Sequence, residues 1–306
     1  MQRRKVIGVL LLDKPTGLSS NTALQVAKRL YRADKAGHAG TLDPLASGLL
    51  PILLGDATRF SAYLLDADKR YLAEVALGAT TETGDAEGAV LLRRPVEVSP
   101  ERLAQVLARF TGTQTQVPPM YSAIKRDGTP LYVLARRGET VERAARQIEI
   151  NSLNVIAFSG DRLTLDVRCS KGTYIRTLAE DIGEALGCGA HLTGLRRTAA
   201  GALDLSEAQT LEALEALSED ARDGLLIPAE RLLEGLPRLD LDSGQTRLFL
   251  HGQTLTLAGD PAAPAVCRVY GVDGRFLGLA DAGEGRLKPR RLMPTAEDGA
   301  KDAPTG

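Results

Sequence analysis

The sequence predicts an α+β fold with a mixed, largely antiparallel sheet, flanking helices and a small C-terminal β domain. Two kinds of segment predict it: strand-like alternation over Lys69–Leu77 and residues 163–169, and helix-like periodicity over residues 100–110 and 175–186. Strands that pair by hairpins and are mixed with helices favour this class over a doubly wound parallel sheet. After residue 239, short strands separated by Gly and Asp turns predict a separate β domain.

In the first half of the chain, each expected element has a local signal. Residues 6–12 form an apolar run that predicts a buried strand, and a turn at residues 15–17 follows. Ser19, Ser20 and Asn21 are candidate caps for a helix with apolar residues at helical spacing. A Gly-rich loop is expected over residues 34–48. A half-buried strand is expected over Lys69–Leu77, followed by a polar turn over residues 81–88. Ser99 followed by Pro100 predicts a helix start.

The second half adds a strand at residues 163–169 and a helix over residues 175–186 that Gly187 ends. Residues 206–235 predict two further helices on an acidic outer face. Beyond them, short strands are expected at residues 248–250, 254–257, 266–270 and 276–279. The small, polar segment 294–306 is expected to be disordered.

Composition is that of an ordinary globular protein, with 43% hydrophobic and 25% charged residues among 306. This length suits one large domain and one smaller one. No apolar run is long enough to span a membrane, and the run at residues 6–12 stops at Asp13 without a cleavage site. We therefore expect a cytoplasmic protein. The three cysteines and three histidines are scattered, which argues against a disulfide framework and against a metal site.

Charge is unevenly distributed, although the net charge is only −1. Residues 206–242 contain 3 basic and 10 acidic side chains, so this segment sums to −7 and the rest of the chain to +6. Much of the positive charge lies in three clusters: Arg136, Arg137, Arg143 and Arg146; Arg162, Arg168, Lys171, Arg176, Arg196 and Arg197; and Arg286, Lys288, Arg290 and Arg291. Such clusters suit a polyanion, but from charge alone a solvated surface explains them equally well.

The segment from Gly37 to Gly48 is the most informative for chemistry. Its glycines allow unusual backbone angles and close approach of a large ligand, and Pro44 restricts Asp43 to an extended conformation. A carboxylate on a stiff loop suits positioning catalysis, while an Asx-type turn at Asp43 is the alternative. The chain lacks the glycine-rich nucleotide motifs, the G-x-S-x-G elbow and H-E-x-x-H, and no second carboxylate stands out as a glycosidase partner.

Six ordered segments together resemble bacterial tRNA pseudouridine-55 synthases. The resemblance covers roughly residues 8–200 and, more loosely, the C-terminal β segment. It is carried by residues 11–20 (LLDKPTGLSS), 37–48 (GHAGTLDPLASG), 69–71 (KRY), 117–123 (VPPMYSA) and 169–178 (CSKGTYIRTL), followed by Leu195-Arg196-Arg197.

This resemblance implies a pseudouridine synthase fold and an isomerase that needs no cofactor and no metal. Asp43 is then the catalytic nucleophile or base, and Arg176 is its ion-pair partner, which would lower the pKa of a buried carboxylate. Tyr71 is implied to lie against the base and to handle its C5 proton. Tyr174 and Leu195 are implied to be walls of the uracil pocket, although plain core packing would also account for both and for Tyr71.

The resemblance also implies how the RNA is held. The substrate is the uridine at position 55 in the T-loop of tRNA, which must be flipped out, and His38 is expected to fill the vacated space by stacking. Lys14, Arg136 and Arg137 are expected to bind substrate. Residues 119–146 resemble an insertion that closes over the RNA within a catalytic domain, 1–238. Residues 239–293 resemble a PUA-type domain that contacts the acceptor side of tRNA. A monomer without a protein partner is expected.

Two other functions remain open at this point. A non-catalytic RNA-binding module or tRNA chaperone would use the same basic surface, although it would not need Asp43, Tyr71 and Arg176 together. A synthase that modifies uridines in ribosomal RNA would share the same chemistry, and the Gly37–Gly48 segment argues only weakly against it.

Overall fold

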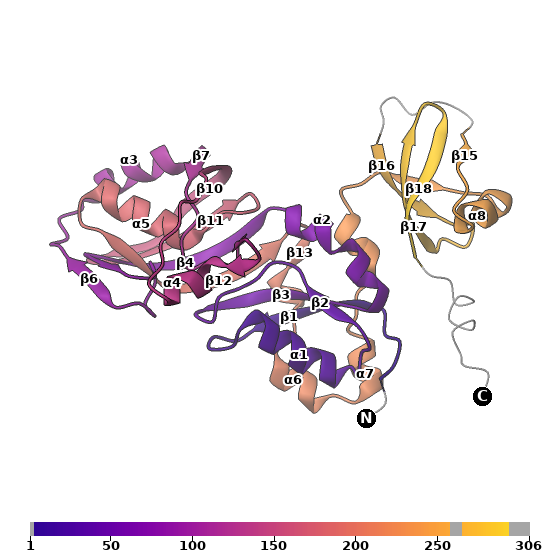
Figure 1. Cartoon of the computed structure of the whole chain (residues 1–306), viewed down its shortest axis with the longest axis horizontal. Helices are drawn as coiled ribbons and strands as arrows, with labels where there is room; N and C mark the ends of the chain where they lie inside the picture. The colour runs from indigo at the N-terminus through magenta and orange to yellow at the C-terminus, as the bar shows by residue number, and fades with distance from the viewer. Residues whose placement is uncertain (1–2, 258–264, 294–306) are drawn as a thin grey trace.

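A computed structural model of the chain describes residues 3–257 and 265–293. The expected disordered tail, 294–306, lies outside the described residues. Figure 1 shows a larger, elongated part built on one long sheet, and a small β domain set against one end of it. No helix in the described part of the chain has the length and apolar character to cross a membrane.

The larger sheet has nine strands and confirms the α+β prediction. Its main path runs β1–β3–β12–β4–β11–β10–β7; β2 pairs with β3, and β13 pairs with β12. All of its pairs are antiparallel except β12 with β3. The strands are β1 (Gly8–Lys14), β2 (Ala36–His38), β3 (Ala46–Leu54), β4 (Lys69–Leu77), β7 (Gly112–Gln116), β10 (Arg146–Ser159), β11 (Arg162–Cys169), β12 (Ala190–Ala200) and β13 (Leu203–Asp204).

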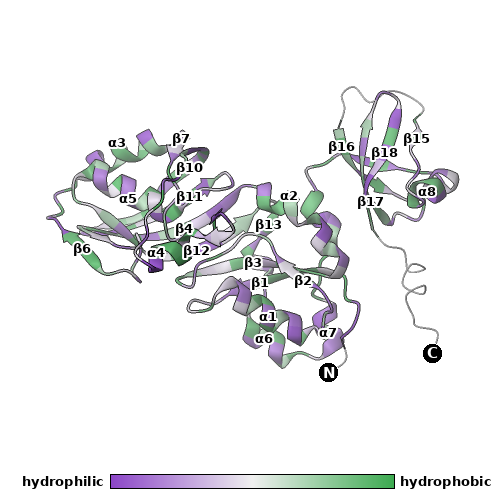
Figure 2. Cartoon of the chain, viewed as in Figure 1, coloured by the Kyte–Doolittle hydropathy of each residue, from purple (hydrophilic) through white to green (hydrophobic). Residues whose placement is uncertain are grey.

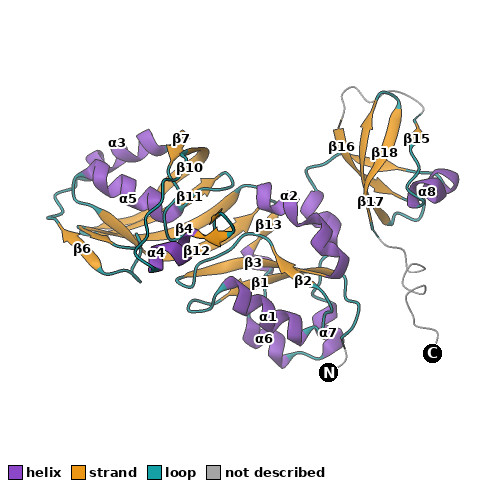
Figure 3. Cartoon of the chain, in the orientation of Figure 1, coloured by secondary structure: helices purple, strands orange, loops and turns teal. Residues whose placement is uncertain are grey.

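Helices cover this sheet in two places. On one half, α3 (Pro100–Phe110) and α5 (Ile175–Leu186) pack on β4, β10, β11 and β12 (Figure 3). The core between them includes Val106, Leu165 and Ile182. Both helices begin and end where the sequence predicts: Ser99 caps α3, and Gly187, with φ 90°, ends α5.

On the other half, β1 and β3 lie between two layers. Leu10 and Leu50 pack against α1 (Ser20–Leu30) and α6 (Leu211–Ala216). The opposite face packs against η1 (Gly55–Phe60), α2 (Ser61–Asp66) and η3 (Ala229–Leu233). The acidic segment contains α6, α7 (Glu219–Asp223) and the short helices η2 (Leu205–Glu207) and η3, which confirms its helical character.

Two hairpins project from this framework. One joins β5 (Ala79–Thr81) to β6 (Val90–Arg93), and Figure 2 colours most of β6 as hydrophobic although its side chains are exposed. The other lies within residues 119–146 and comprises β8 (Lys125–Arg126) and β9 (Thr129–Pro130), followed by α4 (Leu131–Arg136).

The small domain is a five-stranded sheet in the order β14–β16–β17–β18–β15. It packs on the larger part through Phe276, whose ring centre lies 5.6 Å from that of Phe60. Its elements are β14 (Arg238–Asp240), α8 (Ser243–Leu250), β15 (Leu255–Thr256), β16 (Ala265–Tyr270), β17 (Phe276–Gly283) and β18 (Arg286–Leu292).

Local predictions failed at three places. The expected strand at residues 248–250 is the end of α8, because Asp242 and Gln245 form a capping box that starts a helix upstream. Residues 34–48 are not all loop, since they contain β2 and the start of β3. Strand β1 begins and ends two residues later than expected.

Candidate active site

The loop between β2 and β3 carries Asp43 and is fixed from two sides. Ser20, the buried first residue of α1, both accepts from the Leu42 N–H at 2.7 Å and donates to the Leu42 carbonyl at 2.8 Å. The Gly17 N–H donates to the Pro44 carbonyl at 2.8 Å. Because both neighbours of Asp43 have bonded backbone groups, the carboxylate has a defined place.

Arg197 fixes the same loop from the sheet. Its side chain is fully buried on β12, where Nε donates to the Leu49 carbonyl at 2.7 Å and Nη2 to the Gly40 carbonyl at 3.0 Å. Gly40 has φ 83°, and a Cβ there would lie only 3.1 Å from Arg197 Nη1. A side chain at position 40 would therefore be strained by the backbone angle and would lie tightly against Arg197, and both effects favour glycine there.

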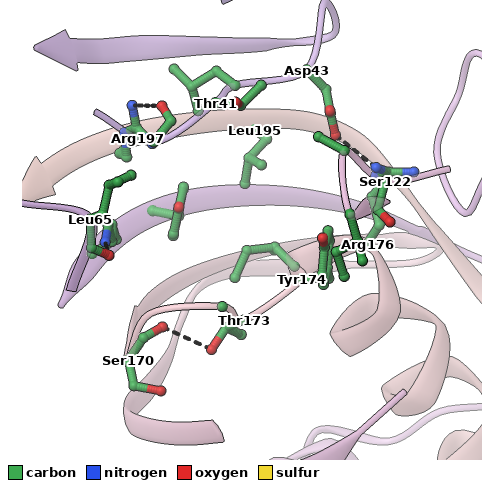
Figure 4. A pocket seen from close by; sticks show the side chains of 18 of the residues that line it. Thr41, Asp43, Leu65, Ser122, Ser170, Thr173, Tyr174, Arg176, Leu195 and Arg197 are labelled. Atoms are coloured by element: carbon green, nitrogen blue, oxygen red, sulfur yellow. Dashed lines mark hydrogen bonds and ion pairs between the residues drawn. The ribbon is translucent and has the colours of Figure 1, made fainter. Parts of the chain in front are cut away.

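Asp43 and Arg176 form the ion pair at the centre of the site. Asp43 Oδ2 lies 2.9 Å from Arg176 Nη2 (Figure 4). The Arg176 side chain is 7% exposed, whereas that of Asp43 is 46% exposed. The expectation of a buried carboxylate is therefore wrong: the cation is buried, and the carboxylate opens to solvent where a ligand can reach it.

Arg176 has three further partners, all of them polar groups of neighbouring segments. Nη1 donates to the Thr83 carbonyl at 3.0 Å, and Nη2 donates to the Tyr121 carbonyl at 2.7 Å. Asp85 Oδ2 lies 3.6 Å from Nε, and the Asp85 side chain is 5% exposed. Arg176 thus stands between two carboxylates, one buried and one open, which fixes its guanidinium plane beside Asp43.

Asp85 is itself tightly held. Its Oδ1 accepts from the Thr83 hydroxyl at 2.5 Å and from the Glu87 N–H at 3.1 Å. Sequence reasoning described residues 81–88 only as a polar turn and missed this carboxylate. A lone Asp in a Gly-containing turn is a weak signal, because such residues usually bond their own backbone.

The ion pair opens into a cavity of about 400 Å³. Tyr71, Tyr174 and Leu195 line it, together with Ser122 from the insertion and Arg146 from β10. Burial raises the pKa of the Tyr71 phenol, against the opposing influence of Arg197, so Tyr71 is neutral and can donate a hydrogen bond near neutral pH. A cavity with apolar walls, two phenols and one open carboxylate suits a flat polar ring.

Comparison with known proteins identifies the family. Residues 28–175 match the model described as "TruB family pseudouridylate synthase (N terminal domain)", residues 176–234 match "tRNA pseudouridylate synthase B C-terminal domain", and residues 237–293 match "Pseudouridine synthase II TruB, C-terminal". The chain belongs to the TruB family. It is therefore an isomerase of the pseudouridine synthase class, as the sequence predicts.

TruB-family relatives match over nearly the whole chain. The "tRNA pseudouridine synthase B" of Aromatoleum aromaticum is 57% identical over 96% of this chain and 95% of its own length. The "tRNA pseudouridine synthase B" of Cupriavidus metallidurans is 56% identical over 96% of this chain and 96% of its own length. Among solved structures, a Cbf5–Nop10–Gar1 complex matches with TM-score 0.73 and 25% identity over 94% of this chain and 85% of that chain. An H/ACA RNP bound to a substrate RNA containing 2′-deoxyuridine matches with TM-score 0.71 and 25% identity over 94% of this chain and 86% of that chain.

In this TruB-family chain, five of the candidate residues line one cavity: Asp43, Tyr71, Arg176, Tyr174 and Leu195. The cavity lining does not include the other four candidates: His38, Lys14, Arg136 and Arg137.

Each of these four has a distinct environment. His38 ends β2, and its buried Nδ1 has no hydrogen-bond partner; burial, helped by Arg197, lowers its pKa. Lys14 is fully buried and donates to the carbonyls of Pro15 and Leu18, and burial lowers its pKa to about 8. Lys14 therefore supports the turn formed by residues 15–18. Arg136 and Arg137 are exposed at the end of α4, where Arg136 lies over the Tyr132 ring.

No group of three or more His, Cys, Asp or Glu side chains gathers as a metal site within residues 3–257 and 265–293. Cys169, Cys188 and Cys267 are free and buried.

Proposed function

We propose that this TruB-family chain converts the uridine at position 55 in the T-loop of tRNA to pseudouridine, with Asp43 as its essential carboxylate. The observation that carries the proposal is the open carboxylate of Asp43 at 2.9 Å from a buried Arg176, at the mouth of a cavity walled by Tyr71, Tyr174 and Leu195. The names of the relatives, tRNA pseudouridine synthase B, support tRNA as the substrate.

The reaction breaks the bond between C1′ of the ribose and N1 of uracil, turns the base, and joins C1′ to C5. The C5 proton must leave, and N1 must gain a proton, so atoms balance without an oxidant, a reductant or net hydrolysis. Asp43 acts as the nucleophile or base, since it is the carboxylate that reaches the cavity, and Arg176 holds it ionised and oriented. Tyr71, neutral and at the cavity wall, lies against the base and handles the C5 proton.

The target base must leave the T-loop to enter a cavity of this size. Unstacking a base costs a few kcal/mol, and stacking one on a ring returns about 1–3 kcal/mol. His38, whose ring is neutral and half-buried at the end of β2, fills the space that the uridine leaves.

Binding and chemistry divide between the two parts of the chain. Residues 1–238 carry the catalysis, and the insertion 119–146, with Arg136 and Arg137 exposed at the end of α4, closes over the RNA loop. Residues 239–293 act as a PUA-type domain on the acceptor side of tRNA. Strand β18 presents its basic side chains to phosphates there: Arg286, Lys288, Arg290 and Arg291.

The test uses the purified chain and an unmodified tRNA transcript, followed by chemical mapping of pseudouridine at single-nucleotide resolution. One pseudouridine, at the T-loop uridine, is the expected result. A transcript with cytidine at that position is the matched control and should remain unmodified. Modification of ribosomal RNA fragments but not of tRNA, or no modification of either, would contradict the proposal.

A further inference from the structure

Strand β7 places one buried amide side chain directly behind the active-site cavity. Gln116, the last residue of β7, is 3% exposed and is not among the residues that line the cavity. Its Oε1 accepts from the Tyr174 N–H at 2.8 Å, and its Nε2 donates to the Tyr174 carbonyl at 3.1 Å. A single side chain thus bonds both backbone groups of a cavity-wall residue that is 58 positions away in the chain.

The partner strand holds the ring of the same residue. Arg146 is the Cα partner of Gln116 across β7 and β10. Its guanidinium lies over the Tyr174 ring, with Cζ 4.9 Å from the ring centre, and its Nη2 donates to the Gly172 carbonyl. The two opposed residues therefore fix Tyr174 by its backbone and by its ring.

Tyr174 is also the N-cap residue of α5, and it caps this helix without a side-chain hydrogen bond. The second residue of α5 is Arg176, so the position of the Tyr174 backbone sets the position of the guanidinium beside Asp43. A displacement of the helix start would move both the wall of the cavity and the ion pair. Small displacements of this kind affect catalysis strongly, because reacting groups must be aligned closely.

We infer that Gln116 is a positioning residue for this site, which acts through Tyr174 to fix the cavity wall and the start of α5. The inference rests on the proposed function for its kinetic part only. The positioning role requires both hydrogen bonds of the Gln116 amide, the one that it accepts from the Tyr174 N–H and the one that it donates to the Tyr174 carbonyl.

Three variants test this requirement. Gln116→Met keeps the size and loses both bonds. Gln116→Glu, when ionised, accepts from the Tyr174 N–H but cannot donate to the carbonyl; when protonated, it offers the same acceptor and donor as the amide. Gln114→Met is the matched control, because Gln114 lies two residues earlier on the same face of β7 and bonds the Arg109 carbonyl, away from the cavity.

The kinetic measurement is the single-turnover rate of pseudouridine formation at saturating RNA, with the RNA dissociation constant measured in parallel. Gln116→Met should lower the rate about tenfold and change the dissociation constant less than twofold, and Gln114→Met should change neither. Relative to the unsubstituted chain at each pH, the rate of Gln116→Glu should recover as pH falls and its carboxyl becomes protonated. A rate for Gln116→Glu that does not recover, or equal losses in Gln116→Met and Gln114→Met, would overturn the inference.

A measurement without substrate separates this inference from the proposed function. The amide proton of Tyr174 should shift in the NMR spectrum of Gln116→Met, retain its position in Gln114→Met, and follow the same pH dependence as the rate in Gln116→Glu. If the unsubstituted chain forms no pseudouridine, the proposed function fails, yet this amide shift still tests the bond. An unchanged Tyr174 amide in folded Gln116→Met would overturn the inference. If Gln116→Met does not fold, Gln116→Glu alone carries the test through its pH dependence.

Discussion

Replacement of Arg176 by Met separates the stability of the site from its chemistry. The guanidinium lies between Asp85, whose side chain is 5% exposed, and Asp43, whose side chain is 46% exposed. Removal of a partner from a buried ion pair costs about 3–5 kcal/mol, because the remaining charge stays buried. Loss of a half-exposed pair costs only about 0.2–1 kcal/mol. The free energy of unfolding of Arg176→Met should therefore fall by about 3–5 kcal/mol, and Asp85 should be the cause.

A second substitution tests that assignment. In Arg176→Met with Asp85→Asn, the stranded charge is removed, while the side-chain oxygen at position 85 still accepts from Glu87 N–H and Thr83 Oγ1. Stability should return to within about 1–2 kcal/mol of the unsubstituted chain. Both variants should lack pseudouridine formation, because Asp43 has no cation in either. Asp43→Asn alone should cost less than about 1 kcal/mol.

The assays are urea unfolding at equilibrium, followed by circular dichroism, and pseudouridine mapping on the same preparations. If the double variant is as unstable as Arg176→Met, the buried charge of Asp85 is not the source of the loss. If the double variant retains nearly full activity, Arg176 does not serve the chemistry through Asp43.

Three further predictions concern other parts of the molecule. Burial raises the pKa of Glu180 to about 7, so the stability that its uncharged form contributes is complete below pH 4.5 and is lost as pH rises through 7. In unfolding experiments, Glu180→Gln should be more stable than the unsubstituted chain by about 1–2 kcal/mol at pH 8 and equally stable at pH 4.5, and the difference is smaller than the full pKa shift implies because Glu180 is partly exposed. His38→Ala should slow single turnover about tenfold without abolishing it, since it removes stacking and no reacting group; a complete loss in a folded variant would assign His38 a chemical role. Glutamine at the four basic positions of β18 (Arg286, Lys288, Arg290 and Arg291) should weaken tRNA binding and reduce the slope of log K against log salt by roughly one unit per lost phosphate contact, with little effect on a T-arm stem-loop. Equal loss of maximal rate on both RNAs would instead place the small domain in the active site.

Much of the fold could be predicted because its signals are local. The alternation of Lys69–Leu77, the Ser99 cap and the Gly187 stop each specify one element from its own residues. Elements that depend on distant pairing were missed. Strand β2 has three half-buried residues and exists because it pairs with β3, and β12 joins the sheet by its pairing with β3 and β4.

The site divides in the same way. Asp43, Tyr71 and Arg176 each belong to a contiguous motif, so the resemblance to the family identified them as candidates. The structure places all three around one cavity. Asp85 and Gln116 contact residues far away in the chain, and no motif in the sequence predicts a role for either of them. Only the folded chain shows that each is buried against a residue of the site.

Single turnover of Asp43→Asn on an unmodified T-arm tests the central claim most directly. The substitution keeps the shape of the side chain and removes its charge, and Asp43 opens to the cavity without supporting the core. We predict an RNA dissociation constant within about threefold of the unsubstituted chain, since the phosphate contacts are retained, and no pseudouridine at any time point. Measurable pseudouridine formation by a variant purified free of host enzyme would show that another group performs the chemistry.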